Sequence, residues 1–131
     1  MTRKGTIAKG VTVEGPYSHA VAANGLVFLS GQVAYDRNTK EPVPADVAGQ
    51  AHWVFANLEA ALASAGLDFG DVVKCNVYLI DMTDFDAMNT VYKQYIAAPY
   101  PARTTIQVAA LPMGARIEIE AVAANRKDKT A

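Results

Sequence analysis

The chain has 131 residues, with 12 Lys and Arg against 13 Asp and Glu, and a formal net charge of −1. This length is enough for one domain whose hydrophobic core needs no disulfide or metal. Hydrophobic residues make up 51% of the chain, which excludes a disordered protein, and the balanced charge provides no basic surface for nucleic acid or anionic lipid. The sequence has one cysteine, no apolar run near the ~20 residues of a membrane span, and no apolar stretch typical of a secretory signal. We therefore expect a single domain over residues 1–131, located in the cytoplasm.

The first third of the chain is predicted to form strands. Apolar runs at residues 19–23 and 26–30 flank Asn24 and Gly25. Asn-Gly between two such runs predicts a β-hairpin, because both central residues of a type I′ turn need positive φ. A second turn is predicted at residues 36–39.

Two helices are predicted, over residues 46–65 and 84–96, because apolar residues recur in both at helical spacing. Asp46 is the candidate N-cap of the first helix, and Gly66 stands where a C′ glycine belongs. Asp81 or Thr83 could cap the second helix, and two prolines prevent its continuation.

Three further strands are predicted at residues 72–80, 103–111 and 116–124. Strands that flank a helix usually run parallel. Two helices can cover only one face of the sheet, and we expect the apolar face that includes Val73 and Cys75. The other face mixes charged residues with Tyr78, Val122 and Ala109. In the strand at residues 103–111, Ala109 lies on the same side as Arg103. Such a face is either open to water or buried against another subunit, and we favour the subunit.

Few residues suggest chemistry by spacing alone. His19 and His52 have no metal-ligand spacing and are expected to be structural or surface residues. Cys75 is expected to be a packed core thiol. No metal site is predicted.

Arg103 and Glu118 form the strongest pair of candidates. The guanidinium of Arg103 suits a carboxylate, and Glu118 could hold and polarise a water. The alternative is a solvated strand end and an exposed acidic face. If the last two strands formed a simple hairpin, Arg103 and Glu118 would lie ~20 Å apart at ~3.4 Å per residue. Either those strands are not neighbours, or the site lies between subunits.

The segment PARTTIQVAALP at residues 101–112, followed by IEIEA at 117–121, resembles the signature of the RidA (YjgF) family of reactive intermediate deaminases. Residues 15–18, 29–33, 71–74 and 84–89 agree with the same family in the same order. The resemblance covers nearly the whole chain.

The resemblance implies an α+β, chorismate-mutase-like fold, with a mixed sheet of about six strands and two helices on one face. The last strand would insert beside earlier strands. Members are homotrimers with sites between subunits, and they hydrolyse 2-enamine and 2-imine acids, such as 2-aminoacrylate or 2-aminocrotonate, to 2-oxo acids and ammonia. No metal or cofactor is implied, and the partner is a small anionic imino or oxo acid rather than nucleic acid or a membrane.

The resemblance also implies residue roles. Arg103 matches the arginine that pairs with the substrate carboxylate, and Glu118 matches the glutamate that activates water. The positions that match substrate-binding residues are Tyr17, Ser30, Gly31 (through its backbone), Asn89 and Thr105. Many relatives have a cysteine at the position of Thr105, so any role that needs a thiol is absent here. The alternatives are a non-catalytic trimer that binds a 2-oxo acid or acts as a regulator or chaperone, and a deaminase specific for another pathway's imino acid.

Overall fold

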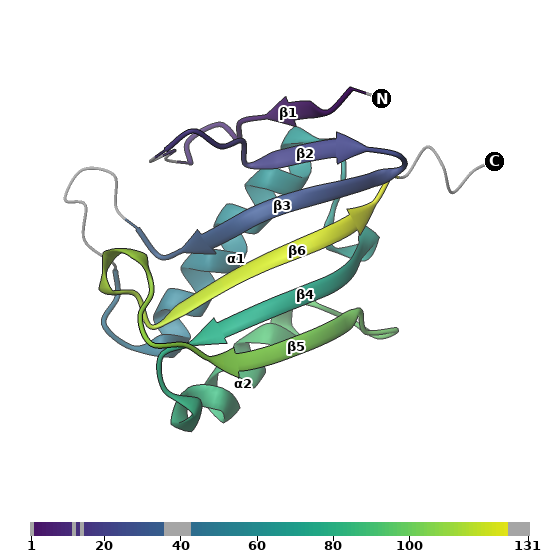
Figure 1. The fold of residues 1–131 in the computed structure, drawn as a ribbon. Helices are drawn as coiled ribbons and strands as arrows, with labels where there is room; N and C mark the ends of the chain where they lie inside the picture. Colours follow the sequence, from purple (N-terminus) through teal and green to yellow (C-terminus); the bar gives the residue numbers. More distant parts are fainter. Residues whose placement is uncertain (1, 12, 14, 36–42, 126–131) are drawn as a thin grey trace.

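A mixed six-stranded sheet with two helices on one face makes up the part of the chain that the computed structural model describes, residues 2–11, 13, 15–35 and 43–125. The elements are, in chain order, β1 (Lys4–Thr6), β2 (Ala20–Ala23), β3 (Leu26–Val33), α1 (Val47–Ser64), η1 (Phe69–Asp71), β4 (Val72–Leu79), η2 (Met82–Asp84), α2 (Phe85–Tyr95), β5 (Ala102–Gln107), η3 (Pro112–Gly114) and β6 (Ile117–Ala124), where η marks a 3₁₀ turn. Figure 1 shows α1 and α2 behind the same face of the sheet. The predicted α+β class is confirmed.

Local chemistry sets several element boundaries where the sequence predicted them. Asn24 and Gly25 have φ of 51° and 78°, so the hairpin between β2 and β3 uses the expected left-handed turn residues. The Asp46 side chain accepts a hydrogen bond from the Gly49 amide and caps α1. Gly66, with φ of 77°, ends that helix. The short strand β1 was not predicted, and the turn expected at residues 36–39 lies outside the described residues.

The order of the strands is β1-β2-β3-β6-β4-β5. β6 pairs antiparallel with both β3 and β4, whereas β5 pairs parallel with β4 at the edge of the sheet. The last two strands are therefore not a hairpin, because β4 lies between them (Figure 1). Of the two alternatives above, the first, that these strands are not neighbours, is correct.

Two predictions about strand faces are wrong. The register pairs Cys75 with Arg103, and both side chains therefore lie on the helix side, not on the open side expected for Arg103. Alternation shows which residues share a face, but the register with β4 decides which face that is. In β4 itself, an irregularity between Val72 and Lys74 places Val72 in the core and leaves Val73 46% exposed.

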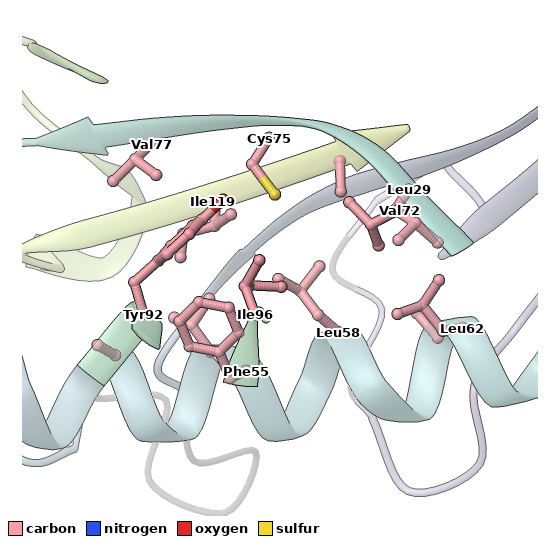
Figure 2. Close-up of a cluster of buried hydrophobic side chains, with 14 of the residues drawn as sticks. Leu29, Phe55, Leu58, Leu62, Val72, Cys75, Val77, Tyr92, Ile96 and Ile119 are labelled. Carbon is pink, nitrogen blue, oxygen red and sulfur yellow. The ribbon is translucent and has the colours of Figure 1, made fainter. Parts of the chain in front are cut away.

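The core lies between the sheet and α1. Figure 2 shows Phe55, Leu58 and Leu62 of α1 beneath sheet residues such as Cys75 and Ile119. Phe55 is fully buried, stacks on Tyr95 at 4.6 Å between ring centroids, and makes edge contacts with two further rings. The cysteine thiol is buried, as predicted.

Within the described part of the chain, no helix covers the opposite face of the sheet. Glu118 and Glu120 lie there together with Tyr78, which pairs with Glu118 across β4 and β6. Phe28 and Ile106 on this face are 45% and 44% exposed. Charged and apolar side chains mix on this face, as predicted, but β5 contributes Ile106 to it and not the Arg103 side of the strand. The exposed apolar side chains leave area for another surface to cover. Among the described helices, none is long and apolar enough to cross a membrane.

Candidate active site

Arg103 is held by α2. The guanidinium Nη1 donates a hydrogen bond to Asn89 Oδ1 at 2.7 Å. It also lies over the ring of Tyr92, 4.7 Å from the centroid, and 5.6 Å from that of Phe85. These contacts fix the plane of the guanidinium, because a hydrogen bond and a cation–π contact each restrain its orientation. Part of the side chain stays accessible, and its remaining N–H groups can bind an anion.

A cavity of about 270 Å³ opens beside this arginine. Its lining residues are Asn89, Tyr92, Lys93, Tyr100, Pro101 and Arg103. Two cationic side chains on one small cavity favour a carboxylate ligand. Asn89 and Arg103 were predicted here, but the support that Tyr92 gives to the guanidinium was not. The available signal was its position three residues after Asn89, on the same face of α2.

Glu118 lies on the other face of the sheet, against a bulge in β3. The pairing of β3 with β6 shifts between Leu29 and Gln32, so that Ser30 and Gly31 occupy an irregular segment. A Cβ at residue 31 would overlap the Glu118 carboxylate, so only glycine leaves room for it. Burial, and secondarily the charge of Glu120, raises the pKa of Glu118. A carboxylate with a raised pKa is suited to proton transfer near neutral pH.

Glu120 is held by two donors from β4. Its Oε1 accepts a hydrogen bond from Asn76 Nδ2 at 3.0 Å and a short one from the Tyr78 hydroxyl. The hydrogen bond to Glu120 is the main reason that the pKa of Tyr78 rises to about 12. Glu120 therefore has fixed partners, whereas Glu118 faces a cavity.

The cavity at Glu118 has a volume of about 730 Å³, and Tyr17 and Gly31 also line it. Tyr17 is 42% exposed, with its ring edge-on to His19 at 6.3 Å. Beside Gly31, the Ser30 hydroxyl donates to the Ser18 carbonyl at 2.6 Å, which leaves its oxygen able to accept from a ligand. The structure thus brings together four of the predicted residues on this side.

The two halves of the predicted site lie on opposite faces of the same sheet. Arg103 of β5 pairs with Cys75 of β4, and Cys75 pairs with Ala121 of β6. Glu118 is three residues from Ala121 along β6, which corresponds to about 10 Å at ~3.4 Å per residue. Arg103 contacts α2 on the covered face, while Glu118 is on the open face. One small substrate cannot touch both within a chain.

The remaining candidates have structural surroundings. His19 is fully buried and its Nδ1 accepts from the Ala8 amide at 2.8 Å, as expected of a core histidine. His52 Nδ1 lies 2.7 Å from the Tyr95 hydroxyl. Thr105 lies on the α2 side, and its buried Oγ1 has no hydrogen-bond partner. Within residues 2–11, 13, 15–35 and 43–125, no group of three or more His, Cys, Asp or Glu could hold a metal ion.

Comparisons with known proteins show which proteins this chain resembles. Residues 8–125 match the family model described as endoribonuclease L-PSP. Protein DfrA of Myxococcus xanthus is 50% identical over 111 residues, which is 83% of this chain and 85% of that protein. The 2-iminobutanoate/2-iminopropanoate deaminase of Homo sapiens is 46% identical over 116 residues, 88% of this chain and 85% of that enzyme.

A solved structure agrees with these matches in fold. The crystal structure of E. coli TdcF with bound serine superposes with a TM-score of 0.80 and 39% identity, covering 91% of this chain and 98% of that one. The fold and these matches define a class of α+β proteins. In this class, β5 pairs parallel with β4 at one edge of the sheet, and the last strand is inserted between earlier strands. The chain belongs to the RidA (YjgF) family.

Proposed function

We propose that this protein is a hydrolase that converts reactive 2-imino and 2-enamine acids to 2-oxo acids and ammonia. The single observation that carries the proposal is the pair of half-sites: an anchored arginine on a cationic cavity, and a half-buried glutamate with a raised pKa on a larger one. The named activity of the human relative supports the same reaction class. Residues 1–131 would form one domain of this kind, and the cytoplasmic location stays a prediction.

The proposed reaction needs little from the protein beyond placement. Arg103 binds the substrate carboxylate through its free N–H groups, so that the imine carbon faces Glu118. Glu118 takes a proton from water as the water oxygen bonds to that carbon, which gives a carbinolamine. The substrate enters with its imine nitrogen protonated, so this carbinolamine is neutral. Glu118 then returns the proton to the nitrogen, the C–N bond breaks to release ammonia, and the hydroxyl gives its proton to the Glu118 carboxylate as it becomes the carbonyl. Tyr17, Ser30 and the Gly31 backbone would line the pocket around the substrate.

If Arg103 and Glu118 act on one substrate, the two half-sites must come from different chains. We propose a homotrimer in which Glu118 of one protomer faces the Arg103 cavity of the next. The exposed Phe28 and Ile106 on the open face support this arrangement, because an assembly would remove them from water. Light scattering at micromolar concentration should give three times the 13.9 kDa chain mass. A monomeric mass would contradict the intersubunit site.

The activity is tested by ammonia release. A pyridoxal-phosphate-dependent dehydratase acting on serine generates 2-aminoacrylate, and added protein should accelerate formation of pyruvate and ammonia. The Arg103→Ala variant should not. If wild-type protein binds a 2-oxo acid but leaves the rate of ammonia release unchanged, the non-catalytic binding alternative is correct.

A further inference from the structure

A buried glutamine in the first turn of α1 connects two segments that surround Glu118. Gln50 is 2% exposed, and it lies behind the residues that line the Glu118 cavity. Its Nε2 donates a hydrogen bond to the Pro44 carbonyl at 2.8 Å, and its Oε1 accepts one from the Arg116 amide at 2.8 Å. A carbonyl only accepts and an amide N–H only donates, so these partners fix the orientation of the side-chain amide. Gln50 therefore ties the segment before α1 to the segment before β6.

The bond to Arg116 supports the end of β6 that carries Glu118. In the described part of the chain, the ladder between β3 and β6 ends where Val33 pairs with Glu118. Figure 1 shows the end of β3 and the start of β6 at the same end of the sheet. Arg116 lies two residues before Glu118, beyond this last pair. Its amide is held by Gln50, and its guanidinium lies 2.8 Å from the Asp84 carboxylate. The backbone just before the glutamate is therefore fixed from α1 and from the turn before α2.

The bond to Pro44 holds a wall of the same cavity. Pro44 and Gly49 both line the Glu118 cavity, and they are in close contact. A Cβ at residue 49 would lie 2.6 Å from Pro44 Cγ, so any larger residue there would push the proline ring away. On the other side of Gln50, η3 also lines the cavity and leads into the segment before β6. One buried side chain thus holds two walls of the cavity.

We infer that Gln50 is a positioning residue for the reaction, which holds the Glu118 carboxylate and the two walls around it in the arrangement that turnover needs. The inference rests on the proposed deaminase function, in which Glu118 must meet a water beside the imine carbon. Gln50 acts through Pro44 and Arg116 and not by contact with substrate. A small displacement of a reacting group costs much of the rate, so loss of this support should appear in turnover.

The test replaces Gln50 by methionine, which has a similar length but no donor and only a weak acceptor. With 2-iminopropanoate as substrate, kcat should fall by ~10-fold or more while KM changes by less than ~2-fold, because substrate binding depends on Arg103 in the other half-site. Leu62→Val is the matched control. It truncates a fully buried residue of the same helix, about 18 Å from Gln50 at ~1.5 Å per residue. It should lower the melting temperature and leave kcat at the wild-type value. Wild-type kcat in folded Gln50→Met would overturn the inference.

A second readout does not depend on activity. Carbon-13 NMR of the Glu118 side chain reports its carboxyl pKa, which burial raises in the wild type. Gln50→Met should lower this pKa, because looser walls admit water to the carboxylate, and Leu62→Val should leave it unchanged. If the wild type hydrolyses no imine but the pKa falls in Gln50→Met, the proposed function fails and the hold of Gln50 on Glu118 stands. If imines are hydrolysed and Gln50→Met keeps the wild-type kcat, the positioning role is wrong and the function stands.

A second variant covers the case in which Gln50→Met does not fold. Gly49→Ala displaces Pro44 while Gln50 stays in place, and alanine is favoured in a helix. It should lower both kcat and the pKa of Glu118. If both stay at their wild-type values in folded Gly49→Ala, the inference is wrong.

Discussion

Replacing Gly31 by alanine should impair turnover without unfolding the protein. The backbone of Gly31 is outside the left-handed region, so alanine can adopt it. The added Cβ would lie 2.9 Å from Cδ and 3.1 Å from Cγ of Glu118. Both atoms belong to a flexible side chain that can move aside. The energetic cost therefore falls on the position of the carboxylate and not on the fold.

The structure sets the size of this effect. Carbon atoms prefer separations of about 3.5–4.0 Å, so the Glu118 carboxylate must retreat by roughly 0.5–1 Å. A displacement of ~1 Å at a reacting group costs on the order of 100-fold in rate, or about 2.7 kcal/mol at ~1.36 kcal/mol per tenfold. Gly→Ala substitutions at compatible positions stabilise by ~0.4–1 kcal/mol through the unfolded chain. We therefore expect kcat/KM to fall ~30–100-fold with the melting temperature within a few degrees of wild type.

The assay is the hydrolysis of 2-iminopropanoate, with circular dichroism to follow melting. Gly70→Ala, in η1 at the other end of β4, is the matched control and should retain wild-type activity. In the Glu118→Gln background, Gly31→Ala should add little further loss, because residues that act through one group are not additive. Full activity in a folded Gly31→Ala protein would refute the requirement for a fixed carboxylate. If Gly31→Ala lowers kcat/KM as much in the Glu118→Gln background as in wild type, the effect comes from the Gly31 backbone and not from the carboxylate.

Three further predictions follow from the same geometry. Arg103→Ala should lower kcat/KM by ~30–1,000-fold, or ~2–4 kcal/mol, while the thermal melt stays cooperative; a loss below ~3-fold would contradict a role in carboxylate binding. Glu120→Gln removes a like charge that raises the pKa of Glu118, so the pKa of Glu118 should fall. The acid limb of the plot of kcat/KM against pH, where activity is lost as Glu118 becomes protonated, should then move to lower pH. An acid limb that stays in place or moves to higher pH would show that Glu118 is not the titrating base. Phe55→Ala should cost ~3–5 kcal/mol of unfolding free energy in urea titration, since a fully buried ring leaves a cavity, and a cost under ~1 kcal/mol would contradict the packing in Figure 2.

Local sequence chemistry was sufficient for the hairpin, for both helices and for most strands. The Asn24-Gly25 turn, the Asp46 cap and the Gly66 terminus depend only on near neighbours in the chain, and all three are confirmed. Family motifs added the candidate site residues, because Arg103 and Glu118 lie in segments whose spacing is specific. The β1 strand was missed because three residues are too short for a periodic signal.

Long-range pairing decided the rest. The family resemblance implied that the last strand inserts beside earlier strands, whereas periodicity within a strand contains no information about its neighbour. The insertion of β6 between β3 and β4 depends on contacts between segments far apart in the chain. The same pairing turned Arg103 toward α2, because its partner Cys75 faces the core. The bulge at Gly31 likewise exists only in the register of β3 with β6.

The sequence by itself determined the elements and their residue chemistry, because turn conformation, capping and side-chain alternation are properties of neighbouring residues. Only the tertiary structure decided that Arg103 and Glu118 lie on opposite faces of one sheet, since strand order and register are set by which distant segments bury the core together. That separation is the physical reason to expect an active site that a single chain cannot complete.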